Sequence, residues 1–190
     1  KPIAIDPASD ELSYYPMIYW PVTEDAPLIE PAMAAKLNRY LKNGGTIFFD
    51  TRDSAGGGVA ADRLEEIAHH LDVPPMTAIP SDHVLTKAYY LLREFPGRWT
   101  GGRLWVQQSA SQAAERANDG VSSIIVGGHD WAAAWAMDDA RKPLFAVVPG
   151  GERQREMAYR FGINLMMYVL TGNYKADQVH LPAILERLGQ

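Results

Sequence analysis

The chain has 190 residues with a formal net charge of -5, and 47% of its residues are hydrophobic. This length and composition fit one globular domain with a core of its own and exclude a disordered chain. The acidic balance argues against a dedicated nucleic-acid binder, which presents a basic face. Cysteine is absent. Disulfides, thiolate zinc sites and a cysteine nucleophile are therefore excluded.

The start of the chain, Lys1-Pro2-Ile3, lacks an initiator Met, and no signal peptide follows it. The longest apolar run, around Phe161 to Leu170, contains Gly162 and Asn164 and is too short to span a bilayer. We expect a single α/β domain over residues 1–190, excised from the C-terminal part of a larger protein, and a membrane anchor elsewhere in that protein is compatible with this sequence.

The first predicted element is a strand over Met17 to Trp20. Pro31 then suits the first residue of a helix, and Gly44 suits its end. The next strand, Thr46 to Asp50, carries a continuous apolar run at Ile47-Phe48-Phe49, as expected of a strand covered on both faces. A helix with Leu64, Ile67, Ala68 and Leu71 on one face follows the loop at Gly56-Gly57-Gly58.

The middle of the chain gives weaker patterns. Residues 73–80 hold three prolines and are expected to be extended. Ser81 or Asp82 is the expected cap of a short helix that carries Val84, Ala88, Leu91 and Leu92. Residues 104–106 read as a strand, and residues 107–118 as a loop or a weak surface helix.

The C-terminal half returns to clear alternation. Strands are expected over residues 122–126 and 144–148, and helices over residues 131–137, 152–170 and 181–188. Alternating strands and helices imply a mostly parallel sheet between helical layers, which is a three-layer α/β sandwich.

Three of the predicted strands end in polar or glycine-rich turns. These are residues 50–53, residues 127–130 and Pro149-Gly150-Gly151, the last leading to Arg153 and Arg155. In open α/β sheets ligands bind at the carboxyl edge, where exits of adjacent parallel strands converge. Glycines allow close approach of the backbone, and arginines donate to carboxylates or phosphates. The candidate ligand-binding residues are Asp50, Arg52, Asp53, Gly127, Gly128, His129, Asp130, Arg153 and Arg160.

A purely structural interpretation stands beside this one. Arg52 has three acidic neighbours to pair with, namely Asp50, Asp53 and Asp130, and glycine pairs are common between strands and helices. Arg153, Arg160 and Asn164 share one side of the long helix, either as a solvated polar face or as anion donors in the pocket. Neither glycine pair fits a nucleotide-binding motif.

Catalytic patterns are few. His83 and His129 each suit an acid or base, although turn or capping roles fit them better. Asp50 with Asp53 suits Mg²⁺, although a solvated turn is the stronger interpretation. No G-x-S-x-G elbow occurs. Trp131 and Trp135 share a helix face and are expected in the core. No catalytic residue, metal or cofactor is assigned.

Three segments together resemble a known family. They are residues 159–180, which begin Tyr-Arg-Phe-Gly-Ile-Asn, residues 44–52, which read Gly-Gly-Thr-Ile-Phe-Phe-Asp-Thr-Arg, and residues 95–98, Phe-Pro-Gly-Arg. The chain is similar over nearly its whole length to the prokaryotic domain-of-unknown-function family 4159. This family has no established activity to carry over.

The resemblance implies a flavodoxin-like fold, similar to class I glutamine amidotransferases. Similar domains carry a further strand and helix before the position of Ile3, so one strand of the sheet is expected to be missing. Members often follow an aerotolerance-regulator-type membrane region in bacterial proteins. The resemblance thus implies a C-terminal domain attached to the inner membrane through its parent, on the cytoplasmic side, with the parent's other domains as partners.

Two functions follow as hypotheses, beside a third interpretation in which the domain is a pure scaffold whose aromatic surface docks a partner chain. The first is a non-catalytic binding or interaction domain with a degenerate amidotransferase-like pocket for a small anionic ligand, because that reaction needs a cysteine. The second is a hydrolase that uses Asp50, His83 or His129, with or without a metal. The sequence indicates neither a nucleic-acid partner nor an oligomeric state.

Overall fold

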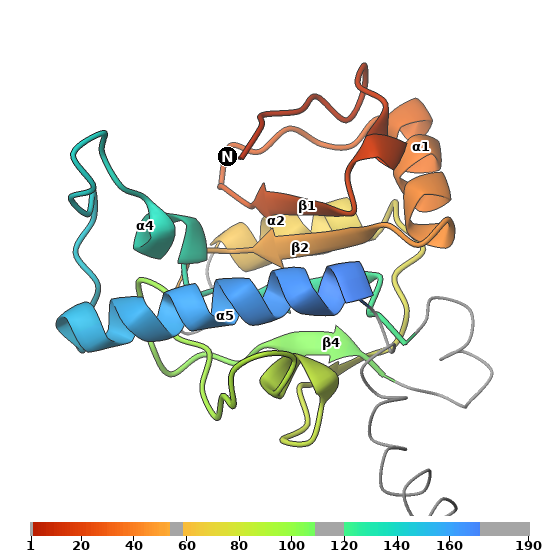
Figure 1. Ribbon diagram of the computed structural model, residues 1–190. Coiled ribbons are helices and arrows are strands. Elements are labelled where there is room, and N and C mark those ends of the chain that lie inside the picture. Colours follow the sequence, from red (N-terminus) through yellow and green to blue (C-terminus); the bar gives the residue numbers. More distant parts are fainter. Residues whose placement is uncertain (1, 54–58, 109–119, 172–190) are drawn as a thin grey trace, which may run out of the picture.

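The computed structural model describes residues 2–53, 59–108 and 120–171. These residues form a five-stranded sheet with helices on both faces (Figure 1). The expected helix at 181–188, the glycine loop at 56–58 and most of the segment 107–118 lie outside the described residues. The mixed α/β class predicted from the sequence is confirmed.

The sheet is parallel at its centre and antiparallel on one side. Its strands are β1 (Met17–Pro21), β2 (Thr46–Asp50), β5 (Ile124–Gly127), β4 (Trp105–Gln107) and β3 (Met76–Ala78), in that spatial order. β1, β2 and β5 run parallel, whereas β4 runs antiparallel to both β5 and β3. The carboxyl ends of β1, β2, β5 and β3 therefore meet at one edge.

The helix before β2 forms for the reasons that the sequence suggests. α1 (Pro31–Lys42) begins with its proline in the first turn, and Gly44 follows its end at φ 95°. This left-handed backbone is one that glycine adopts without strain. Together with α2 (Val59–Ala68), α1 covers one face of the sheet, where Leu37 and Ile67 pack on Ile47 and Phe49.

The opposite face carries α4 (Trp131–Trp135), α5 (Gly151–Thr171) and the 3₁₀ turn η2 (Val84–Thr86). Figure 1 shows α5 lying along this face. Phe48 of β2 packs there against Trp131 and Phe161, with ring centroids 5.0 and 6.0 Å away. Successive residues of β2 thus enter two different cores, because side chains alternate along a strand. A further 3₁₀ turn, η1 (Leu12–Tyr14), precedes β1.

The predicted strand over residues 144–148 is wrong. This segment forms no ladder with the sheet, and Leu144, Phe145 and Val148 are exposed at 57%, 43% and 46%. The free side of β5 is already occupied by the antiparallel strand β4, so the sheet has no position there for another parallel strand.

The predicted helix over Val84 to Leu92 is also wrong, since only the three-residue turn η2 forms, with His83 as its cap. The side-chain amide of Asn164 binds backbone groups that such a helix would pair with each other. Its Nδ2 donates to Leu85 O, and its Oδ1 accepts from Tyr89 N. In a helix that oxygen and that N–H would bond to each other. Asn164 is itself fully buried, contrary to its predicted polar face.

Candidate functional site

Asp50, at the carboxyl end of β2, is fully buried and accepts four hydrogen bonds. Its Oδ1 accepts from the N–H groups of Arg52 and Asp130 at 3.0 and 3.2 Å. Its Oδ2 accepts from Trp131 N at 2.9 Å and from the hydroxyl of Tyr19. Burial raises the pKa of Asp50, against the effect of these hydrogen bonds. The carboxyl group joins β1, β2 and the start of α4.

Asp130 occupies the turn from β5 into α4, with φ 52° and ψ 56°. Its carboxylate accepts from Arg52 Nε at 3.0 Å and from Arg98 Nη1 at 3.4 Å. Arg52 has a positive φ as well, at 63°. Left-handed backbone in residues other than glycine is strained, and such residues cluster at functional sites. Both carboxylate oxygens of Asp130 are thus occupied by arginines.

Gly128 lies where the turn after β5 crosses the turn after β2. A Cβ at this position would lie 2.7 Å from Asp53 Oδ1 and 2.9 Å from Thr51 Oγ1. The Thr51 hydroxyl donates to Asp53 Oδ1 at 2.6 Å, whereas Asp53 Oδ2 is buried without a partner. The structure therefore brings Asp50, Arg52, Asp53 and residues 127–130 together at one edge, as the strand exits predict.

A cavity of about 900 Å³ opens beside this cluster, which we call the recess. It lies at the same edge of the sheet, because the end of β3 at Ala78 pairs with the start of β4 at Trp105, which pairs with β5. Its volume falls within the usual range of small-molecule sites. His129 lines the recess, whereas Asp50 and Arg52 are not among its lining residues.

His129 is the one candidate from the sequence that both contacts the cluster and lines the recess. The residue is 2% exposed, its ring packs on Trp131 with centroids 4.5 Å apart, and its Nδ1 has no hydrogen-bond partner. Burial lowers the pKa of His129, and a hydrogen bond to the Gly102 backbone opposes that effect. The imidazole is therefore neutral at pH 7.

The recess has an apolar interior and a charged rim. Leu92 and Leu104 are buried in its walls, and the half-buried Phe95 packs on Phe161 with ring centroids 5.5 Å apart. Arg93, Glu94 and Arg103 are exposed at its mouth. Its lining thus carries two positive charges and one negative charge, with His129 neutral.

The wall of the recess is fixed by two residues that the sequence analysis missed. Gly97 lies so close to the turn after β5 that a Cβ there would be 2.3 Å from the His129 carbonyl oxygen. Gln154 is buried in α5, and its Nε2 donates to the carbonyls of Gly97, Arg98 and Val148. A glutamine in the first turn of a helix gives no sequence signal for such a role.

Arg153 and Arg160 lie apart from the hydrogen bonds of this cluster. Arg160 pairs with Glu156 and lies over the ring of Tyr90, 5.1 Å from its centroid. Arg153 is exposed. The prediction that a third strand exit leads to Arg153 and Arg155 is wrong, because residues 144–148 form no strand. Arg155 is buried and donates to the carbonyls of Ala134 and Phe145, which is a structural role.

The alternative catalytic groups have structural partners. His83 Nδ1 accepts from Leu85 N and caps η2, as the capping interpretation proposes. Asp50 has no oxygen left for a cation, since its two oxygens accept four hydrogen bonds. Within residues 2–53, 59–108 and 120–171, no three His, Asp or Glu side chains are grouped as metal ligands.

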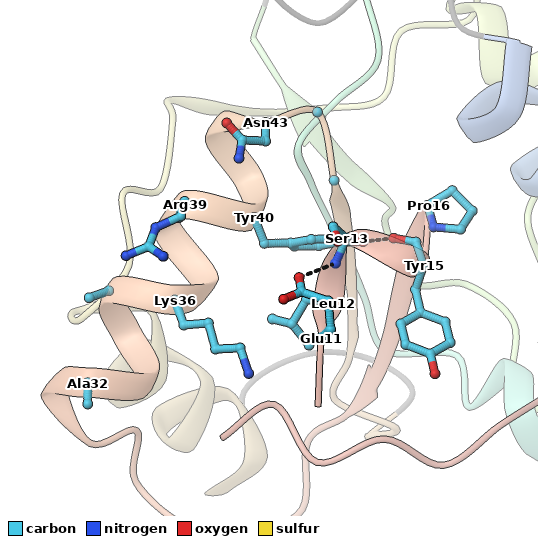
Figure 2. Close-up of a pocket in the computed structure, with 13 residues that line it drawn as sticks. Glu11, Leu12, Ser13, Tyr15, Pro16, Ala32, Lys36, Arg39, Tyr40 and Asn43 are labelled. Atoms are coloured by element: carbon cyan, nitrogen blue, oxygen red, sulfur yellow. Dashed lines mark hydrogen bonds between the residues drawn. The ribbon is translucent and has the colours of Figure 1, made fainter. Parts of the chain in front are cut away.

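A second cavity, of about 400 Å³, lies at the opposite edge of the sheet, between η1 and α1 (Figure 2). The buried hydroxyl of Tyr40 is satisfied there by the carbonyls of Tyr15 and Thr46. Lys36 donates to the Asp10 carbonyl, and Arg39 is exposed. Since its buried polar group is satisfied, this cavity is the weaker candidate and supplies control positions instead.

Comparison with known proteins identifies a family but no curated relative. The family described as "Domain of unknown function (DUF4159)" matches residues 1–170. No curated protein matches the chain. In the part of the chain that the structure describes, no helix is long and apolar enough to cross a membrane.

Proposed function

The chain belongs to the DUF4159 family, and on this premise we propose that it is a non-catalytic domain that binds a small anion in the recess. The observation that carries the proposal is the recess itself. It lies at the carboxyl edge of the sheet, where α/β proteins bind ligands, and carries Arg93 and Arg103 at its mouth.

The groups around the recess favour binding over catalysis. Asp130 occupies the strained turn between strand and helix, where a hydrolase elbow would place its nucleophile, and two arginines hold its carboxylate. Its side chain is 3% exposed. Asp50 is buried and fully hydrogen-bonded, so it is poorly placed to reach a substrate.

Binding is tested directly by titration calorimetry with inorganic phosphate, sulfate and short carboxylates. The ring nitrogen signals of His129 in NMR spectra report whether the ligand enters the recess, with the exposed His69, in the turn after α2, as an internal reference. We expect Arg93→Gln with Arg103→Gln to abolish binding and Arg39→Gln, at the other cavity, to leave it unchanged. Absence of binding by every anion would refute the proposal.

The hydrolase hypothesis remains the second candidate, and His129 is the residue that favours it. Its neutral imidazole has a ring nitrogen, Nδ1, that is buried without a partner, and a general base needs such a free nitrogen together with access to the substrate. An esterase, phosphatase and glycosidase panel, with metal analysis of the purified domain, tests it. Activity that is lost in His129→Gln, while the fold is retained, would replace the binding proposal with the hydrolase.

We further propose the finer fold and setting that the family resemblance implies. These are a flavodoxin-like or class I glutamine amidotransferase-like sheet, a bacterial parent protein in the inner membrane, and the cytoplasmic side for this domain. The parallel arrangement of β1, β2 and β5 supports the fold. Co-purification of the domain with the other domains of its parent tests the partner, and protease protection in vesicles tests the side.

A further inference from the structure

The recess combines two chemistries that a bare inorganic anion would not use together. Its mouth carries opposite charges with one positive in excess, from Arg93, Glu94 and Arg103, and its interior is apolar. From this combination we infer that the ligand is an organic acid with one carboxylate and an apolar body of several carbons. This inference rests on the proposed function of the same recess.

The rim is suited to one carboxylate. Neither Arg93 nor Arg103 forms an ion pair within the described residues. Guanidinium groups bind carboxylates through two parallel hydrogen bonds, so each arginine is a suitable partner for an acid group. Because Glu94 shares the same rim, a ligand of high negative charge would meet repulsion there, and a single charge fits best.

The interior is suited to hydrocarbon. Leu91 is exposed, and Ile79 and Phe95 are half-buried, so these three side chains offer apolar surface to a ligand, and the buried Leu92, Pro96 and Leu104 complete the apolar lining. Transferring one methylene group of a ligand from water into such surroundings tightens binding about fourfold. A hydrated phosphate ion would gain nothing from these side chains.

His129 adds a polar group to the wall without adding charge. Its imidazole is neutral, and the Gly102 backbone holds one of its nitrogens. The charge of the ligand is therefore recognised at the rim by the arginines, and the body of the ligand is received by the apolar wall beneath them. Loss of one rim arginine should therefore weaken the binding of long and of short acids by a similar factor.

The test is a titration series with acetate, butanoate, hexanoate and octanoate, beside inorganic phosphate and 1-hexanol, followed by calorimetry and the His129 ring signals. We expect affinity to rise about fourfold per added methylene until the recess is filled. Hexanoate should bind at least tenfold more tightly than 1-hexanol. Arg103→Gln should weaken hexanoate about tenfold or more, and Arg39→Gln should not.

The outcomes separate this inference from the proposed function. Acetate or phosphate binding as tightly as hexanoate, with a shift at His129, would overturn the organic-acid inference and leave the anion site standing. No anion binding at all would overturn both. Hexanoate binding that Arg93→Gln and Arg103→Gln do not weaken, in variants with unchanged circular dichroism, would place the acid elsewhere and overturn the inference.

Discussion

The Tyr19 hydroxyl, on the edge strand β1, donates a hydrogen bond to Asp50 Oδ2 at the end of the neighbouring strand β2. The same hydroxyl accepts from Ala132 N in α4, at 3.2 Å. Burial and the nearby carboxylate both raise the pKa of Tyr19, so the phenol stays protonated and remains a donor. The pair therefore ties the start of α4 to the sheet edge that bears the recess.

Asp50→Asn should destabilise the domain by about 3 kcal/mol or more. The carboxylate accepts three backbone N–H groups and the Tyr19 hydroxyl, whereas an amide accepts through one oxygen and turns its NH₂ toward the remaining donors. Urea unfolding followed by circular dichroism measures the loss. The exposed Asp139→Asn is the matched control and should shift stability by less than about 0.5 kcal/mol. Equal stability of both variants would show that the Asp50 network is dispensable.

The parts of the fold that could be predicted from the sequence are those encoded locally. A helix begins at Pro31 and ends before Gly44, and a buried strand follows over Thr46–Asp50. Each is specified by short-range geometry or by the local apolar pattern, and all three features form. The same holds for the polar exits at Asp50 and His129, since parallel neighbours bring their ends to one edge. Their ligand-binding role stays a prediction.

What the sequence does not encode locally is which strand occupies the free side of β5. Residues 144–148 have a strand-like pattern, yet β4 fills that position in the antiparallel direction. The recess depends on this arrangement, because its walls come from Ala78 at the end of β3, from the segment between β3 and β4 up to Leu104, and from His129. Arg93 and Arg103 therefore have no sequence signal as site residues, and Gln154 acts on backbone groups distant in sequence.

Acidification should destabilise the domain through His129. Burial lowers its pKa from 6.5, so below pH 6.5 the unfolded chain binds a proton that the folded state resists. The contribution of the neutral His129 to stability is thus fully present above pH 6.5, and it is lost as the pH falls through the lowered pKa of the folded state. In His129→Gln the decline between pH 6.5 and 5 should be shallower, as measured by urea midpoints.

His83 must be considered in the same experiment, because burial lowers its pKa as well. A His129→Gln, His83→Gln double variant should therefore show a shallower decline than either single variant. The exposed His69→Gln is the control and should keep the wild-type slope. An identical slope in wild type and His129→Gln would contradict the buried, neutral imidazole.

Gln154→Ala should lower the free energy of unfolding by about 2–4 kcal/mol, and Gln154→Glu should lower it by at least as much. The amide donates to the carbonyls of Gly97, Arg98 and Val148, and its Oε1 accepts from Gly150 N at 2.8 Å. Alanine leaves buried backbone groups unsatisfied, and a glutamate would turn a charged acceptor toward three carbonyl oxygens. Thermal and urea unfolding measure the cost.

The neighbouring Arg153→Ala is the control for this position, because its exposed side chain lies one residue away on α5. Hydrogen exchange adds a local readout: the amides of Trp99 and Val148, which bond to His129 O and Arg98 O, should exchange faster in Gln154→Ala. Unchanged exchange at these two amides would mean that Gln154 does not hold the wall of the recess.

Asn164→Leu should destabilise the domain by about 3 kcal/mol or more, although leucine suits a helix and a core better than asparagine does. The fully buried amide donates to Leu85 O and Tyr90 O, and it accepts from the N–H groups of Tyr89 and Tyr90. Leucine would remove the hydrogen bonds that Asn164 makes to these backbone groups, and leave the buried Leu85 carbonyl without this donor, unless residues 84–92 closed into a helix. Proton NMR and urea unfolding distinguish the two results. A stable variant with new helical amide contacts between Leu85 and Tyr89 would show that Asn164 alone prevents the helix predicted from the sequence.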